Sequence, residues 1–346
     1  MTINVGDKVL LFPDGRGGYT AYEISAPAVG EKCILLPDGK GGYTAVGVSA
    51  PLAGDKVPVV PDGRGGYLTW CSGGLQIISW GYDEYNQVTD TPSGRGYTAI
   101  AGGGFHSLAL KTDGSIVSWG RDNYDQITDT PAGNDFTAIT AGASFSLALK
   151  TDGSLVAWGN NNGNQVTGTP TGNDFTAIAA GYWHALVLKT DGSIIAWGND
   201  WYDQVSDTPA GNDFTAIAGG YANSHALKTD GSIVSWGWDF YGQVTDTPAD
   251  NDFTAIAGGA NHSLALKTDG SIVSWGYDGY NQVSDTPADN DFTAIAGGAN
   301  HSLALKTDGS IVSWGYNGYG LVSNTPTGNN FTAVASGGDH SLALKR

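Results

Sequence analysis

The chain has 346 residues, of which 53 are glycine, and only 14 % of its residues are charged. Its formal charge is −18, from 34 acidic and 16 basic residues. This balance argues against nucleic-acid binding, which neutralises phosphates with lysine and arginine. The first residues lack the basic start and long apolar run of a signal peptide, and no stretch is long enough to span a membrane. We therefore expect a soluble protein without membrane insertion, located in the cytoplasm or associated with a virion or cell surface.

Residues 1–72 contain three copies of a 24-residue unit. The tripeptide Pro-Asp-Gly recurs in each copy, starting at Pro13, Pro37 and Pro61. Short apolar runs flank a glycine-rich turn, which predicts one β-hairpin per copy. One hairpin alone is marginally stable in water, so we expect the three to pack together, on the rest of the chain or on a partner. We interpret residues 1–72 as an attachment module, for self-association or anchoring.

A second, different unit of 39 residues repeats over residues 73–346. The tripeptide Ser/Ala-Trp-Gly marks each of its seven copies. The marker tryptophans are Trp80, Trp119, Trp158, Trp197, Trp236, Trp275 and Trp314. A fixed period of this length is typical of a propeller, a solenoid or another array.

Each copy predicts four short strands, and the clearest copy begins at Phe253. Phe253–Gly258 is rich in small residues, as a strand crowded near a propeller axis should be. The next two strands, His262–Lys267 and Ser271–Gly276, alternate apolar and polar residues. Asp269-Gly270 between them predicts a tight hairpin turn. The fourth predicted strand is Gln282–Asp285, and no stretch of the unit has helical periodicity.

Four antiparallel strands repeated seven times predict an all-β fold, a seven-bladed β-propeller over residues 73–346. The first copy begins at Leu75 with only a third and a fourth strand. The last copy ends at Arg346 after only a first and a second strand. We expect these N- and C-terminal strands to pair with each other and to close the ring.

The repeated pattern A-G-x-x-H-S-L-A-L…D-G…W-G…G-Q resembles the repeats of the regulator of chromosome condensation family. The resemblance covers residues 75–346 and is strongest toward bacterial members with short repeats, such as the propeller-type β-lactamase inhibitor. It implies the propeller fold. It also implies a binding role, because those inhibitors grip their target with the two sets of loops described next.

The copies differ from one another in two places, just before the repeated histidine and directly after Trp-Gly. In an up-and-down meander both places emerge at the same end of each blade, so we expect them to line one face of the disc. Aromatic residues mixed with Asn and Asp on that face suit protein recognition. The predicted partner-binding residues are Tyr82, Phe105, Arg121, Tyr182, Trp183, Trp201, Tyr221, Trp238, Phe240, Asn261, Tyr277, Asn300, Tyr316 and Asp339.

We interpret the chain as a non-catalytic binding propeller that recognises a protein partner through this face, in an inhibitor-like or surface-attachment role. The alternative is a lectin-like propeller that binds carbohydrates or small molecules on the same aromatic residues. The sequence shows no nucleophile–base pair, paired acids or metal-ligand set, so we expect no catalytic residue, metal or cofactor.

Other repeated residues are interpreted as structural. A histidine recurs at one position in five copies, whereas a catalytic histidine would need a specific partner in one copy; the five are His106, His184, His262, His301 and His340. His225 is displaced from this position by two residues. The tyrosines five places after the marker tryptophans are assigned to packing or loop bracing. Aspartates after Trp-Gly are assigned to Asx-turns, and the one lysine per copy to a solvated ring.

Overall fold

The computed structural model describes residues 74–346 and the strands of residues 1–73. The chain divides into two compact units, Met1–Gly73 and Gly74–Arg346. In the first unit the strands form three antiparallel pairs: β1 (Val9–Pro13) with β2 (Tyr19–Glu23), β3 (Glu31–Pro37) with β4 (Tyr43–Ser49), and β5 (Val59–Pro61) with β6 (Tyr67–Thr69). The Pro-Asp-Gly turns extend outside the described residues. The hairpin prediction and the attachment role therefore stay predictions.

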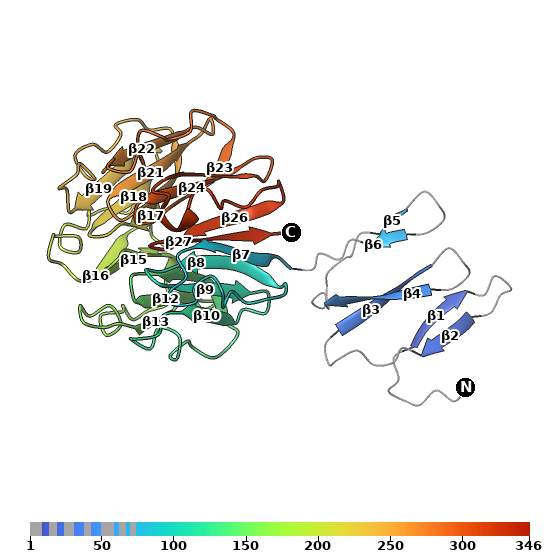
Figure 1. Cartoon of the computed structure of the whole chain (residues 1–346). Helices are drawn as coiled ribbons and strands as arrows, with labels where there is room; N and C mark the ends of the chain where they lie inside the picture. The colour runs from blue at the N-terminus through green and yellow to red at the C-terminus, as the bar shows by residue number, and fades with distance from the viewer. Residues whose placement is uncertain are drawn as a thin grey trace. The chain divides into compact units, whose positions relative to one another are not determined.

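The second unit is a ring of seven three-stranded antiparallel sheets, which we number as blades 1 to 7 (Figure 1). Blade 1 contains β26 (Phe331–Ser336), β27 (His340–Lys345) and β7 (Gln76–Gly81). Blades 2 to 4 contain β8 (Tyr97–Gly102), β9 (His106–Lys111) and β10 (Ile116–Gly120); β11 (Phe136–Ala141), β12 (Phe145–Lys150) and β13 (Leu155–Gly159); and β14 (Phe175–Ala180), β15 (His184–Lys189) and β16 (Ile194–Gly198). Blades 5 to 7 contain β17 (Phe214–Gly219), β18 (Asn223–Lys228) and β19 (Ile233–Gly237); β20 (Phe253–Gly258), β21 (His262–Lys267) and β22 (Ile272–Gly276); and β23 (Phe292–Gly297), β24 (His301–Lys306) and β25 (Ile311–Gly315), followed by the short 3-10 turn η1 (Gly318–Gly320).

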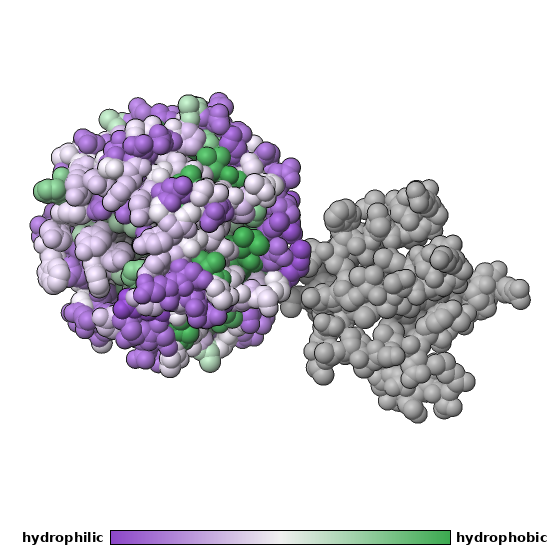
Figure 2. All heavy atoms as spheres, viewed as in Figure 1, coloured by the Kyte–Doolittle hydropathy of each residue, from purple (hydrophilic) through white to green (hydrophobic). Residues whose placement is uncertain are grey.

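The second strand of each blade lies in the core. In β9 both Leu108 and Ala109 are fully buried, although their side chains point to opposite faces of the sheet. Each face of the blade is therefore covered by a neighbouring blade. The surface outside this core is largely hydrophilic or intermediate, with small separate apolar areas (Figure 2). Among the described residues, no helix has the length and apolar character needed to cross a bilayer.

The predicted ring closure is confirmed. In blade 1 the C-terminal strand β27 pairs antiparallel with β7, from His340 opposite Gly81 to Lys345 opposite Gln76. The strands β26, β27 and β7 lie side by side where the two ends of the propeller meet (Figure 1). Blade 1 is thus assembled from residues 76–81 and 331–345.

The predicted fourth strand of each copy, such as Gln282–Asp285, is wrong. The chain makes a helical turn there instead, in which the Asp285 N–H donates to the Asn281 carbonyl (3.1 Å). Asn281 has a φ of 61°, in the left-handed region. All seven copies place Asn, Asp or Gly at this position, the residues that tolerate such a φ. A left-handed residue followed by a turn cannot continue an extended ladder, so each blade has three strands.

The marker tryptophans tie each blade to the preceding one. The Trp119 Nε1–H donates to the Gln87 carbonyl (3.0 Å), and the other six make the equivalent bond at 2.9–3.0 Å. The Trp80 indole of blade 1 donates to the Leu321 carbonyl of blade 7, where leucine replaces glutamine. The seven indoles are 4–6 % exposed. They are inter-blade core, as the sequence indicates.

The repeated histidines join the second strands of neighbouring blades. His106 Nε2 lies 2.8 Å from Ser146 Oγ of the next blade, and four further histidine–serine pairs have distances of 2.7–2.9 Å. All six histidines of the chain are fully buried. A buried polar group needs such a partner because its desolvation is otherwise uncompensated. The structural interpretation of these histidines is therefore confirmed.

Two blades depart from this pairing, and each departure is compensated. In blade 5, Asn223 takes the histidine position and His225 lies two residues on, on the same side of β18. Its Nε2 still reaches the serine of the next blade, Ser263, at 2.8 Å. In blade 3, Phe145 takes the histidine position, and blade 4 has Ala185 in place of serine. Phe145 and Ala185 share one apolar cluster, so no polar atom is left without a partner at that interface.

The natural Phe145–Ala185 pair predicts the result of a double-mutant cycle at His106 and Ser146. Each single change, His106→Phe or Ser146→Ala, leaves one buried polar group unpaired and should cost about 1–3 kcal/mol of unfolding free energy. The double variant should be less destabilised than the sum of the two by about 1 kcal/mol or more. Guanidinium unfolding of the four proteins measures this coupling, and additive costs would contradict it.

The buried histidines also predict a loss of stability in mild acid. Burial holds the pKa of each below its ordinary value of 6.5, to about 3 for His106, His225 and His301 and to about 4 for His184, His262 and His340. Between pH 6.5 and 4 the unfolded chain therefore binds protons that the folded chain does not. Each histidine should remove about 1.4 kcal/mol of unfolding free energy per pH unit fall.

Unfolding curves at pH 7.5, 6.5 and 5.5 measure this slope. The His106→Phe/Ser146→Ala variant is the control, because it carries one fewer titrating histidine and should show a shallower slope. Stability that stays constant over this pH range would contradict the prediction.

Candidate functional site: the variable-loop face

Two loops of each blade form the candidate site. We call the loop between the first and second strands the inner loop and the five residues that follow Trp-Gly the outer loop. The inner loops are residues 103–105, 142–144, 181–183, 220–222, 259–261, 298–300 and 337–339. The outer loops are residues 82–86, 121–125, 160–164, 199–203, 238–242, 277–281 and 316–320.

A backbone hydrogen bond joins the two loops within every blade. The Arg121 N–H donates to the Phe105 carbonyl (2.9 Å), and the Tyr82 N–H donates to the Asp339 carbonyl (2.8 Å). The other five blades make the same bond at 2.8–3.0 Å. Both loops therefore lie at the same end of each blade, as the meander topology predicts, and together they make the variable-loop face.

The inner loops form a continuous ring of backbone hydrogen bonds from blade to blade. The Tyr182 N–H, for example, donates to the Gly220 carbonyl of the next blade (2.9 Å), and the seven bonds measure 2.9–3.2 Å. The preceding residue must be glycine, because a Cβ on Gly181 would lie 2.2 Å from the His184 ring. This ring surrounds the mouth of a central channel of about 300 Å³, and Tyr182 and Tyr221 line its rim.

The outer loops interlock through their aromatic rings. The tyrosine that is fourth in one loop contacts the first residue of the next blade's loop. Tyr241 contacts Tyr277 at 4.6 Å between centroids. The same contact recurs at 4.6–5.8 Å in the pairs Tyr202–Trp238, Tyr280–Tyr316 and Tyr319–Tyr82. These contacts support the assignment of the tyrosines to loop bracing.

The tyrosines are also part of the surface, which the sequence interpretation missed. Tyr124, Tyr202, Tyr241, Tyr280 and Tyr319 are 37–55 % exposed. Their recurrence in six of seven copies was the available signal. Repetition alone indicated a bracing role, but a residue can brace a loop with one side of its ring and face solvent with the other.

The series of ring contacts between neighbouring outer loops is interrupted at blade 3. Asn160 stands at the first outer-loop position there and is only 4 % exposed, and Gly163 replaces the bracing tyrosine. The inner loop of the same blade carries Ala143 and Ser144. The variable-loop face therefore has an aromatic side and a short polar side.

Blades 4 and 5 bring several of the predicted site residues together. Tyr182 contacts Tyr221 at 5.0 Å, and Tyr221 contacts Trp238 at 5.9 Å. Trp238 in turn stacks on Phe240 with an interplanar angle of 12°. Phe240 is 73 % exposed and Trp201 is 83 % exposed, so these two rings project furthest into solvent.

The other predicted residues are partly buried around the same face. Tyr82 and Phe105 contact each other at 6.1 Å, and the Arg121 guanidinium lies 4.7 Å from the centre of the Tyr85 ring. Trp183 contacts Tyr182 at 5.5 Å. Tyr277 and Tyr316 belong to the ring contacts between outer loops described above. The remaining members lie on inner loops of the same face, and they are Asn261, Asn300 and Asp339.

Two ionisable groups at or beside the channel mouth have shifted pKa values. Burial raises the pKa of the Asp339 carboxyl above its usual range. Burial also raises the pKa of the Tyr182 phenol, and the nearby Asp339 charge adds to this effect while Arg121 opposes it. Charged residues of blades 1 and 2 therefore influence the pKa of the Tyr182 phenol in blade 4.

The aspartates that follow Trp-Gly cap the helical turn of the outer loop. Asp200 Oδ1 accepts from the N–H groups of Val205 (2.8 Å) and Ser206 (3.0 Å). Asn161 and Asn317 make the same bonds in their own blades. The Asx-turn interpretation of these aspartates is therefore wrong, because an Asx-turn bonds the N–H two residues on, whereas these oxygens bond N–H groups five and six residues on. The described residues contain no cluster of ligating side chains that could hold a metal ion.

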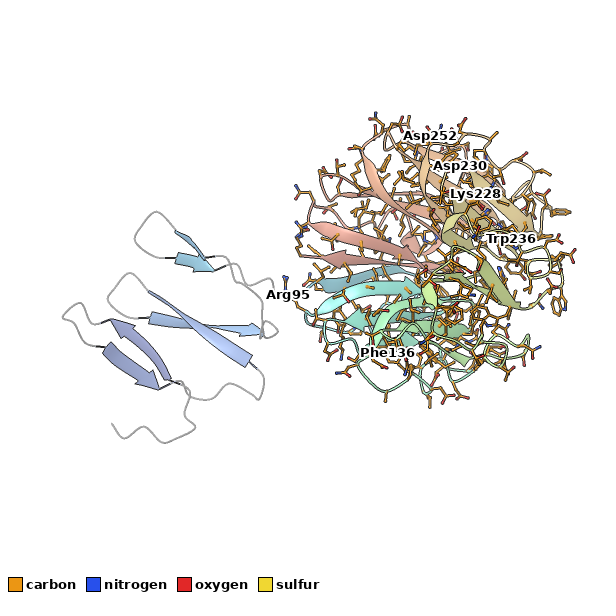
Figure 3. The ribbon with its side chains drawn as sticks, turned by 180° about the vertical axis from the view of Figure 1, so that it is seen from behind. Arg95, Phe136, Lys228, Asp230, Trp236 and Asp252 are labelled. Carbon is orange, nitrogen blue, oxygen red and sulfur yellow. The ribbon has the colours of Figure 1, made fainter. Side chains whose placement is uncertain are left out.

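The opposite face carries the lysines that recur beside the Asp-Gly turns. Lys228 pairs with Asp213 (2.8 Å), and four further lysines have carboxylate partners at 2.7–3.1 Å. Figure 3 shows Lys228 near Asp230 and Asp252, with Trp236 further along the blade. The positive charge of this ring is thus balanced locally.

The profile of the regulator of chromosome condensation (RCC1) repeat matches residues 97–126, 136–165, 175–204, 253–282 and 292–321. Five of the seven blades are RCC1 repeats. Each match runs from the first strand to the buried residue that accepts the tryptophan hydrogen bond. The copies without a match are blade 5, with its displaced His225, and blade 1, which the two chain ends share. None of the curated proteins has a sequence that matches this chain.

Several solved structures share the RCC1 propeller fold. Prp20p of Saccharomyces cerevisiae is 21 % identical over 80 % of this chain and 92 % of its own, with a TM-score of 0.67. Human WBSCR16 is 16 % identical over 79 % and 99 %, with a TM-score of 0.64. The ectodomain of the Arabidopsis thaliana receptor kinase ACR4 is 23 % identical over 70 % and 91 %, with a TM-score of 0.58. At these identities the likeness establishes the fold.

The capping aspartates predict how the outer loops respond to mutation. Asp200→Ala removes the acceptor of two backbone bonds next to Trp201 and should cost about 1 kcal/mol of unfolding free energy. Asp200→Asn should cost much less, because Asn161 and Asn317 cap the same turn in other blades. Thermal unfolding of the two variants tests this difference, and equal losses would contradict it.

Proposed function

We propose that the chain is a non-catalytic recognition protein whose RCC1 propeller binds a protein partner through the variable-loop face. The observation that carries the proposal is the exposure of Trp201 and Phe240, at 83 % and 73 %, beside the Tyr182–Tyr221–Trp238 cluster. Large rings held in solvent by a rigid frame leave apolar area that a partner can cover. Buried aromatic anchors supply much of the energy of protein interfaces.

The frame beneath this face supports recognition rather than catalysis. The six histidines are buried and neutral, and each contacts a serine of a neighbouring blade. The outer-loop aspartates described above accept backbone hydrogen bonds. These histidines and capping aspartates thus already have structural tasks. We assign no catalytic role to them.

The solved relatives agree with a protein partner. Prp20p is described with its binding properties to Gsp1p and histones, and a second structure contains Kap60 bound to it. These partners belong to that protein. For this chain we propose only that the propeller binds a protein. This binding would serve either to inhibit an enzyme or to attach the chain to a surface. Residues 1–72 would then anchor the propeller or join two copies.

Carbohydrate binding is the second candidate for the same face. Trp201 favours it, because an indole that is 83 % exposed offers a flat platform on which a sugar ring can stack. A sugar site would depend on one or two blades. A protein interface would extend over the inner and outer loops of several.

The double variant Trp201→Ala/Phe240→Ala tests the proposal. It should lose at least about 90 % of a protein partner captured from cell lysates, because it removes the two most exposed anchors. The control is Asn123→Ala/Asn162→Ala, which changes the same outer-loop position in blades 2 and 3 and should retain the partner. Affinity capture with quantitative mass spectrometry compares the two.

Circular dichroism and the unfolding midpoint would show that both variants are folded. Equal capture by both would refute the variable-loop face as the protein-binding site. A glycan array probed with the same proteins separates the second candidate, since binding to a defined glycan that only the first variant loses would favour the lectin-like function.

A further inference from the structure

The charge of the variable-loop face is strongly one-sided. Its fourteen loops contain one basic residue, Arg121, and nine acidic residues. The acidic residues are Asp83, Glu84, Asp122, Asp125, Asp200, Asp203, Asp239, Asp278 and Asp339. Eight of them lie on outer loops that also carry aromatic rings, and Asp339 lies on an inner loop. A face of one charge sign attracts a partner surface of the other sign and repels one of its own.

Arg121 shows how this face holds a cation. Its guanidinium carbon lies 4.7 Å from the centre of the Tyr85 ring and 5.5 Å from that of Phe105. Tyr85 lies in an outer loop and Phe105 in an inner loop. The same two kinds of loop carry the aromatic residues of blades 4 and 5. Cation–π contacts of this geometry stabilise a guanidinium by about 0.5–2 kcal/mol, more when water is excluded.

Asp339 supplies an unpaired negative charge beside the channel mouth, directly after the lining residues Gly337 and Gly338. It is partly buried, and its carboxylate has no hydrogen-bond or ion-pair partner among the described residues. The mouth also carries Tyr182, whose ring lies 5.0 Å from Tyr221. A half-desolvated carboxylate beside aromatic rings is stabilised by a cation that contacts both.

We propose that the occupant of the variable-loop face is a basic polypeptide segment, with an arginine or lysine side chain seated at the channel mouth between Asp339 and the Tyr182–Tyr221 rings. The inference rests on the proposed function and names the chemistry of the partner. The stem of such a side chain packs on the rings while its charged end meets the carboxylate. The exposed rings of Trp201 and Phe240 would cover neighbouring residues of the same segment.

Selection from a library of displayed random 12-residue peptides on the full chain tests this proposal. We expect the bound peptides to be enriched in arginine and lysine over the library. Two variants with the same charge change provide the comparison. Asp339→Asn alters the channel mouth, and Asp308→Asn alters an Asp-Gly turn on the opposite face, where the amide oxygen can still accept from Ser310.

The affinities of one selected peptide give the quantitative result. Asp339→Asn should weaken its binding about fivefold and Asp308→Asn less than about 1.5-fold. Replacing the key arginine of the peptide by citrulline, its neutral isostere, should weaken binding about tenfold. Bound peptides that are neutral or acidic, an empty selection, or equal losses with the two aspartate variants would overturn the proposal.

This test separates the two levels of inference. If Trp201→Ala/Phe240→Ala loses a protein partner while Asp339→Asn binds it as the unmodified chain does, the proposed function stands and the basic occupant is wrong. If neither variant loses the partner, the proposed function itself fails.

Discussion

The contact between second strands of neighbouring blades is the constraint on which the propeller depends. These strands are buried on both faces, so the polar side chains that they carry need hydrogen-bond partners on the neighbouring blade. Histidine and serine satisfy this condition at five interfaces, and His225 with Ser263 at a sixth. At the seventh, Phe145 and Ala185 remove both polar groups at once. The interface tolerates a change of chemistry when both sides change together.

This interface also positions the candidate site. Five of the six histidines follow directly after an inner loop, and each marker tryptophan precedes an outer loop by two residues, so the buried contacts hold the base of both loops. The loops need only short local bonds of their own, such as the Asp200 cap and the Tyr241–Tyr277 contact. Side chains such as Trp201 can therefore vary between blades at little cost to stability. A fixed frame with variable loops is an arrangement suited to recognition.

Much of the fold can be predicted from the sequence, because a 39-residue period fixes the number of blades and the incomplete first and last copies predict how the ring closes. The fourth strand was predicted wrongly, since Asn, Asp or Gly at the position of Asn281 signals a left-handed residue that a strand pattern conceals. The role of His225 depends on the register of β18 against the next blade, which spacing along the chain does not reveal.

The candidate site is predictable in part, because the meander topology places the inner and outer loops on one face. The contacts of Tyr202 with Trp238, and of Arg121 with Tyr85, depend on distances between blades that no single repeat encodes.

The pairing of β27 with β7 has a consequence for biosynthesis. Gln76–Gly81 leaves the ribosome before the other strands of the propeller, yet its partner His340–Lys345 is made after all the others. During translation the early strand keeps an unpaired edge while six complete blades assemble beside it. A growing chain of this kind is exposed to pairing with a neighbouring nascent chain, and charged or fast-folding blades next to that edge reduce the hazard.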